Sequence, residues 1–119
     1  MDKKKRTRGL IVFAVIVLAL LAGVLGVIGS FVTGSNMSSN ILFTDVQVNA
    51  AADLGVSSSP LLAAQTAGAS AGSMISPSKI ILGTTAGSVP GEEGTVLRFT
   101  LLTAAILTLV TGVICWIIL

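Results

Sequence analysis

Residues 10 to 32 form an uninterrupted stretch without a single charged side chain. The stretch, LIVFAVIVLALLAGVLGVIGSFV, holds 23 residues and would span about 34 Å as an α-helix. A hydrocarbon core is about 30 Å thick, so this length matches a helix that crosses a bilayer. A cleaved signal peptide is the alternative, but its apolar region is ordinarily only about 7–15 residues long. We therefore predict a transmembrane helix over residues 10–33.

A second uncharged stretch closes the sequence. It runs from Leu101 to Leu119 and would span about 28 Å as a helix, enough to cross with little tilt. Together with the residues just before it, this stretch predicts a second transmembrane helix over residues 98–119.

Charged side chains are scarce and unevenly placed. They make up 10% of the chain, whereas a soluble domain carries about 25% because its surface must be solvated. Five of the seven basic residues fall within the first eight positions: Lys3, Lys4, Lys5, Arg6 and Arg8. Because this cluster adjoins the first apolar stretch, the positive-inside rule places residues 1–9 in the cytoplasm. We expect a lipid bilayer as partner and no nucleic acid.

The region from 34 to 97 is neither a hydrophilic loop nor a simple span. Gly, Ala, Ser and Thr dominate it, mixed with Leu, Ile and Val. Two segments are predicted as helices, about Ser38–Leu54 and about Pro60–Ile75. Both are too polar to face lipid alone, so at membrane depth they need other protein around them. The expected fold class is an all-α membrane protein with two transmembrane helices and broken or re-entrant helices between them.

Small residues recur at every fourth position in two places. Such stripes allow close approach of helix backbones, which is how membrane helices commonly pack. They predict partner helices for both segments. The stripes are Ala22, Gly26, Ser30 and Gly34, and Ala64, Gly68, Gly72 and Ser76.

The stretch GSNMSSN at residues 34–40 is the first candidate site. Glycine interrupts the helix, and a helix restarting near Ser38 would offer free N–H groups and partial positive charge to a carboxylate. Hydroxyl and amide side chains there can also present hydrogen-bonding groups to a ligand. Transporters place broken helices at the membrane midplane for this purpose. A capped turn between two helices at the interface is the alternative.

The stretch QTAGASAG at residues 65–72 is the second candidate site. It could be another unwound segment facing the same ligand. Alternatively, it is a tightly packed helix that uses Gly68 and Gly72 as contact points. Asp45 also has two readings, as a proton carrier at membrane depth or as a carboxylate that reaches water or a polar neighbour.

Enzymatic chemistry is not expected. The chain has no histidine and a single cysteine, Cys115, so a Ser-His-Asp triad and the commonest zinc sites are excluded. We expect no metal and no cofactor.

Four blocks of sequence resemble one known family. The block FVTGSNMSSNILF at residues 31–43, followed by Gln47, is similar to the TGS…SN-x-LF…Q signature of L-lactate permeases. The similarity continues through LLAAQTAG at 61–68, GSMISP at 72–77 and EGTVLRFT at 93–100. The blocks keep the family's order and spacing over roughly residues 29–117. Met37 departs from the pattern, since a small hydroxyl residue is common there.

The resemblance implies a secondary transporter of the plasma membrane for L-lactate and related 2-hydroxy monocarboxylates that is coupled to protons. Such permeases have a dozen or so spans, so the chain is expected to be their C-terminal part and to be inactive without the remaining helices. It is also expected to assemble with a further permease chain or to form a homo-oligomer. The implied substrate-binding residues are Ser35, Asn36, Ser38, Ser39, Asn40, Gln65, Thr66 and Gly68. The alternatives are a small structural or regulatory membrane scaffold and a nonfunctional permease remnant.

Overall fold

The computed structural model describes residues 2–119 and folds them into five α-helices. Helix α1 runs over Lys3–Thr33, α2 over Asn36–Leu54, α3 over Ser58–Met74, α4 over Pro77–Ala86 and α5 over Glu93–Ile118. The expectation of an all-α membrane protein is confirmed, and α1 and α5 are the two helices long and apolar enough to cross a membrane.

The breaks between helices lie where local chemistry interrupts the backbone ladder. Gly34 ends α1 with a left-handed φ of 69°, and its N–H donates to the Ser30 carbonyl at 2.8 Å. A residue without a Cβ enters this conformation at little cost, so the chain reverses there. Ser35 then caps α2 by accepting a hydrogen bond from the Ser38 N–H at 3.2 Å. Helix α2 therefore begins at Asn36, two residues earlier than predicted.

The two predicted middle helices are present, and a third accompanies them. Helices α2 and α3 reproduce the predictions within two residues at each end. Helix α4 was not predicted. It begins at Pro77, whose fixed φ suits the first turn of a helix and whose missing N–H is not needed there.

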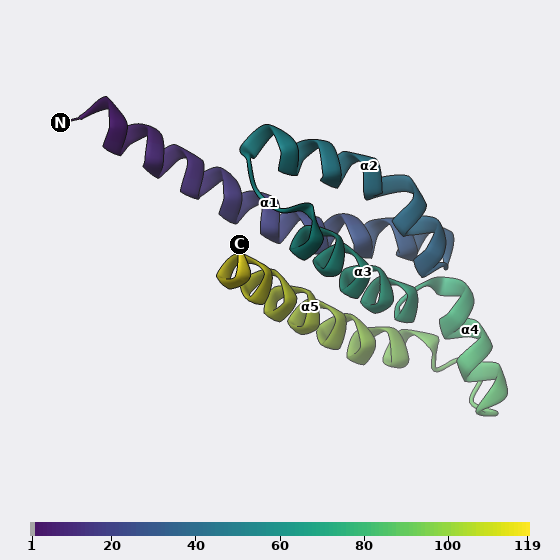
Figure 1. The fold of residues 1–119 in the computed structure, drawn as a ribbon. Coiled ribbons are helices and arrows are strands. Elements are labelled where there is room, and N and C mark those ends of the chain that lie inside the picture. Colours follow the sequence, from purple (N-terminus) through teal and green to yellow (C-terminus); the bar gives the residue numbers. More distant parts are fainter. Residues whose placement is uncertain (1) are drawn as a thin grey trace.

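Helices α1 and α3 form the central pair of the bundle, and they run in the same direction. Helices α2 and α5 pack on this pair from opposite sides and run against it, while α4 extends the far end and contacts mainly α5 (Figure 1). The molecule is accordingly elongated, at 63 × 26 × 17 Å.

The predicted small-residue stripes are the contact between α1 and α3. A Cβ built on Gly26 would meet the Ala69 nitrogen at 2.8 Å, and one on Gly72 would meet the Val27 Cα at 2.7 Å. A Cβ on Gly68 would overlap the Gly23 carbonyl oxygen. The two backbones therefore touch directly, as expected for membrane helices associated through glycine. We call this contact the α1–α3 seam.

Candidate functional site

The first turns of α2 carry two asparagines on one face. Asn36 and Asn40 are four residues apart, so their side chains lie one above the other. The Asn40 Nδ2 donates to the Asn36 Oδ1 at 3.0 Å, and the Asn36 Nδ2 donates to the Ser70 Oγ of α3 at 2.6 Å. The amides thus link the start of α2 to the middle of α3.

Helix α3 contributes three polar side chains to the same place. The Gln65 Nε2 lies 3.4 Å from the Asn40 Oδ1 and 3.5 Å from the Asn40 carbonyl oxygen. The Thr66 Oγ1 lies 3.5 Å from the Asn40 Oδ1. These distances are at the long limit for hydrogen bonds, so Gln65 and Thr66 of α3 hold Asn40 only loosely. We call Asn36, Asn40, Gln65, Thr66 and Ser70 the amide cluster.

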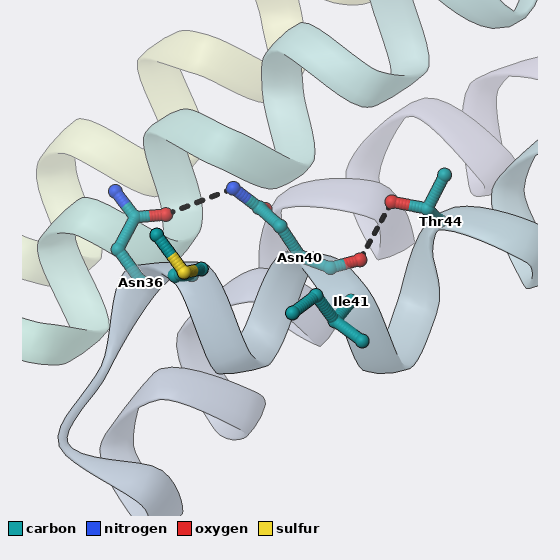
Figure 2. A pocket seen from close by; sticks show the side chains of 5 residues that line it. Asn36, Asn40, Ile41 and Thr44 are labelled. Atoms are coloured by element: carbon teal, nitrogen blue, oxygen red, sulfur yellow. Dashed lines mark hydrogen bonds between the residues drawn. The ribbon is translucent and has the colours of Figure 1, made fainter.

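A shallow hollow lies beside the amide cluster on the surface of α2, whose residues form all of its lining. Figure 2 shows Asn36 and Asn40 along one side of it, with Ile41 and Thr44 further along α2. Met37 completes the lining, and it is 73% exposed, as is Ile41. The hollow therefore combines amide groups with an apolar wall, which suits a small ligand with a polar end and a short hydrocarbon part.

The electrostatics of the hollow depend on neutral groups. The side chains of the amide cluster carry no formal charge, and the first N–H groups of α2 have no partner within their own helix. The partial positive charge of the helix start favours a carboxylate in this position. Residues 2–119 hold no group of three His, Cys, Asp or Glu side chains that could bind a metal ion.

Two predicted site residues point elsewhere in the structure. Ser39 is fully buried, and its Oγ donates to the Gly26 carbonyl of α1 at 2.9 Å. Gly68 lies in the α1–α3 seam against Gly23. Both therefore serve helix packing here, which for Gly68 is the alternative that its sequence context left open.

The remaining predicted residues lie at or beside the cluster. Ser35 is the N-cap of α2, and Ser38 is half-buried with its backbone N–H held by that cap. Asn36, Asn40, Gln65 and Thr66 are brought together as members of the amide cluster. The structure thus assembles four of the eight predicted residues and assigns structural contacts to most of the others.

Two polar residues at the site were missing from the predicted set, as were Met37 and Ile41 of the apolar wall. Ser70 accepts the Asn36 amide, and Thr44 lines the hollow. Their signal was helical spacing: Ser70 follows Thr66 by four residues, and Thr44 follows Asn40 by four.

Two buried glutamines, one of them in the amide cluster, have side-chain atoms without a hydrogen-bond partner among residues 2–119. Gln65 is 1% exposed, and its Oε1 has no hydrogen-bond partner within the described chain. Gln47 of α2 is also 1% exposed, and neither polar atom of its side chain finds a partner among residues 2–119. Buried amides of this kind are costly in apolar surroundings, so further polar groups or water are required around them.

The fold is that of a helical membrane protein, with two helices long and apolar enough to cross a bilayer. The L-lactate permease family matches residues 12–119, and the chain belongs to that family. The chain is 44% identical to the L-lactate permease of Escherichia coli K12 over 90 residues and 36% identical to that of Bacillus subtilis over 91 residues. It is 40% identical to the glycolate permease of Escherichia coli K12 over 90 residues.

These matches cover 76% of the chain but only 16% of each relative. The chain therefore spans about one sixth of the length of the relatives it matches. No solved structure matches it.

Proposed function

We propose that this chain is the C-terminal part of a plasma-membrane transporter for L-lactate and related 2-hydroxy monocarboxylates, and that it works with further permease helices. The amide cluster at the start of α2 is the observation that carries the proposal. The hollow combines the start of α2, amide groups that can form further hydrogen bonds, and an apolar wall. These three features match the carboxylate, the hydroxyl group and the short carbon chain of a small hydroxy acid. The names of the relatives, lactate permease and glycolate permease, support this substrate class.

The proposed binding mode gives each part of the substrate its own contact. The substrate carboxylate would lie at the start of α2, where Asn36 and the free N–H groups of the first turn can donate. The substrate hydroxyl would exchange hydrogen bonds with Asn40 and Thr66, whose present mutual contact is 3.5 Å long. The short carbon chain would lie against Met37 and Ile41.

The predicted residues that the structure places in packing contacts retain a supporting role in this proposal. Ser35 caps the helix whose start would bind the carboxylate, and Ser39 fixes α2 against α1. Ser38 and Gly68 complete the predicted set, the first beside the site and the second in the α1–α3 seam.

Two features suggest that other helices complete the site. The hollow is open on the side away from α3, and the chain spans only 16% of its relatives. A transported anion must be sealed from lipid on every side, so we propose a further permease chain as partner. We also propose coupling to protons and a cytoplasmic N-terminus at residues 1–9, the latter supported by the basic cluster before α1.

Reconstitution of transport tests this proposal. The chain would be co-expressed, in cells without lactate permeases, with an Escherichia coli L-lactate permease that lacks its matching 90 residues. We expect uptake of labelled L-lactate only when both parts are present. A stable, co-purified pair that takes up no lactate or glycolate would contradict the proposal.

The scaffold alternative gives a different result in the same system. A structural or regulatory protein would form stable oligomers whose melting temperature does not respond to lactate. A nonfunctional remnant would fail to accumulate in the membrane.

A further inference from the structure

The position of Asp45 along the bundle follows from one contact between α2 and α1. The bond between Ser39 and the Gly26 carbonyl fixes the level of α2 against α1. Helix α2 runs back along α1, and Asp45 follows Ser39 by six residues, about 9 Å along the axis. Asp45 is therefore level with about Leu20, next to the middle of the uncharged stretch from 10 to 32.

The Asp45 side chain is exposed on the outer face of α2. Helix α2 covers one side of the α1–α3 pair, and no helix among residues 2–119 lies on its other side (Figure 1). Val46 and Leu42 on the exposed surface of the same helix are apolar, so the carboxylate lies in surroundings otherwise suited to lipid. A carboxylate at this depth is costly unless protein or water surrounds it.

The basic residues of this chain all lie far from that level. Five of the seven precede the apolar stretch of α1, at one end of the molecule. Lys79 lies at the opposite end, since its neighbour Ser78 is adjacent to Gly34 and its own Nζ bonds to the Ser73 Oγ. Arg98 is in the early turns of α5, close to α4, and so lies at that same end.

A second copy of the chain therefore cannot offer a cation to Asp45. In a parallel or an antiparallel pair of copies, the basic residues stay at the two membrane surfaces. A cation opposite Asp45 would therefore come from other permease helices, and relatives of this family are about six times longer than the region matched here.

We propose that the outer face of α2 around Asp45 is the docking surface for a transmembrane helix of a partner chain, and that this helix places a lysine or arginine opposite Asp45. Charge complementarity is the argument: an uncompensated carboxylate at mid-membrane depth fits a cationic side chain on an otherwise apolar helix. The inference rests on the proposed assembly with a further permease chain, but it does not depend on the substrate.

Asp53 provides a matched control on the same helix. It is also exposed, and it follows Asp45 by eight residues, about 12 Å nearer the membrane surface. Its carboxylate can reach water at that depth, so it needs no partner cation.

The test uses the complex with the Escherichia coli L-lactate permease that lacks its matching segment. We expect Asp45→Asn to lower the amount of co-purified complex about tenfold or more, and Asp53→Asn to change it less than twofold. Asp45→Lys should abolish the complex. The complex should then be restored when one lysine or arginine in a spanning helix of the partner is replaced by aspartate. This rescue distinguishes a lost contact from poor folding, even if the Asp45→Lys variant accumulates poorly alone.

Several results would overturn the docking surface. Equal recovery of the complex with Asp45→Asn and the unchanged chain would do so, as would equal losses for Asp45→Asn and Asp53→Asn. The docking surface would also be overturned if no substitution in the partner rescued Asp45→Lys. The same holds if only a complex of two copies of this chain depended on Asp45.

Uptake of lactate separates this inference from the proposed function. Transport restored equally by the unchanged chain and by Asp45→Asn would overturn the docking surface alone. A complex that depends on Asp45 but takes up no lactate would overturn the proposed function alone. If the unchanged chain forms no complex and restores no uptake, both proposals fail.

Discussion

Gly68 of α3 lies against the backbone of Gly23 of α1, so that a Cβ on Gly68 would stand 2.9 Å from the Gly23 Cα and overlap its carbonyl oxygen. Backbone atoms cannot give way as a flexible side chain can. The α1–α3 seam thus depends on the absence of a single carbon at this position.

Gly68→Ala is expected to lower the free energy of unfolding by about 3 kcal/mol, because the added carbon forces two backbones apart. Gly83→Ala is the matched control, since Gly83 is also helical and a Cβ there meets nothing within 4 Å. It should raise stability by about 0.5–1 kcal/mol through the usual gain of alanine over glycine in a helix. Unfolding in micelles, followed by circular dichroism, measures both. Equal effects of the two variants would show that the seam does not hold the bundle together.

Ser39→Ala tests the contact that fixes the level of α2 on α1. The variant loses the bond from the Ser39 Oγ to the Gly26 carbonyl, and such bonds between membrane helices are worth about 0.6–2 kcal/mol. We expect a loss of stability of that size, with little change for Ser59→Ala, whose side chain is exposed. The same unfolding experiment measures both variants. An unchanged free energy of unfolding for Ser39→Ala would show that helix packing alone sets the position of α2.

Asn40→Ala is expected to weaken lactate binding in the reconstituted transporter. Asn40 is the hub of the amide cluster, and its loss leaves Asn36, Gln65 and Thr66 without their shared partner. A rise in the lactate concentration for half-maximal uptake of about tenfold is expected, which corresponds to about 1.4 kcal/mol. Ser59→Ala, whose side chain is exposed at the start of α3 outside both the amide cluster and the docking surface, is the control and should leave uptake unchanged. Identical uptake curves for the two variants would remove Asn40 from the site.

Glu93→Gln is expected to loosen the junction between α4 and α5. The Glu93 Oε1 accepts hydrogen bonds from the Thr84 Oγ1 at 3.1 Å and from the Gly91 N–H at 3.2 Å. The neutral amide oxygen accepts more weakly than a carboxylate, so subtilisin should cut the connector at residues 87–92 several-fold faster. Glu92→Gln removes the same charge from an exposed neighbour, and subtilisin should cut this variant at the rate of the unchanged chain. Equal rates for both variants would contradict a role for Glu93 in holding the turn.

Much of the helix plan followed from the sequence because its signals are local. Uncharged stretches of bilayer length predicted α1 and α5, and the breaks at Gly34, Gly55 and Pro77 reflect backbone preferences of single residues. Helix α4 was missed because ten residues between a proline and a glycine-rich turn carry no strong periodic pattern. Its helical state also depends on packing against α5.

The sequence located the candidate site, but it did not show which of its polar residues pack against neighbouring helices and which join the amide cluster. Ser39 and Asn40 are neighbours in one polar run, yet successive helical residues point about 100° apart. One therefore faces α1 and the other faces α3. Composition could not decide which, because the answer depends on where the neighbouring helices lie.

The sequence alone determined that this chain lies in a membrane, since it holds too few charges for a water-facing surface and two uncharged stretches of bilayer length. It also determined the family, through blocks that keep their order and spacing. Only the tertiary structure decided that Gly68 packs against α1 while Gln65 joins the amide cluster, and that Ser39 packs against α1 while Asn40 faces α3. These are consequences of which helix faces which, and backbone contacts between α1, α2 and α3 set that arrangement.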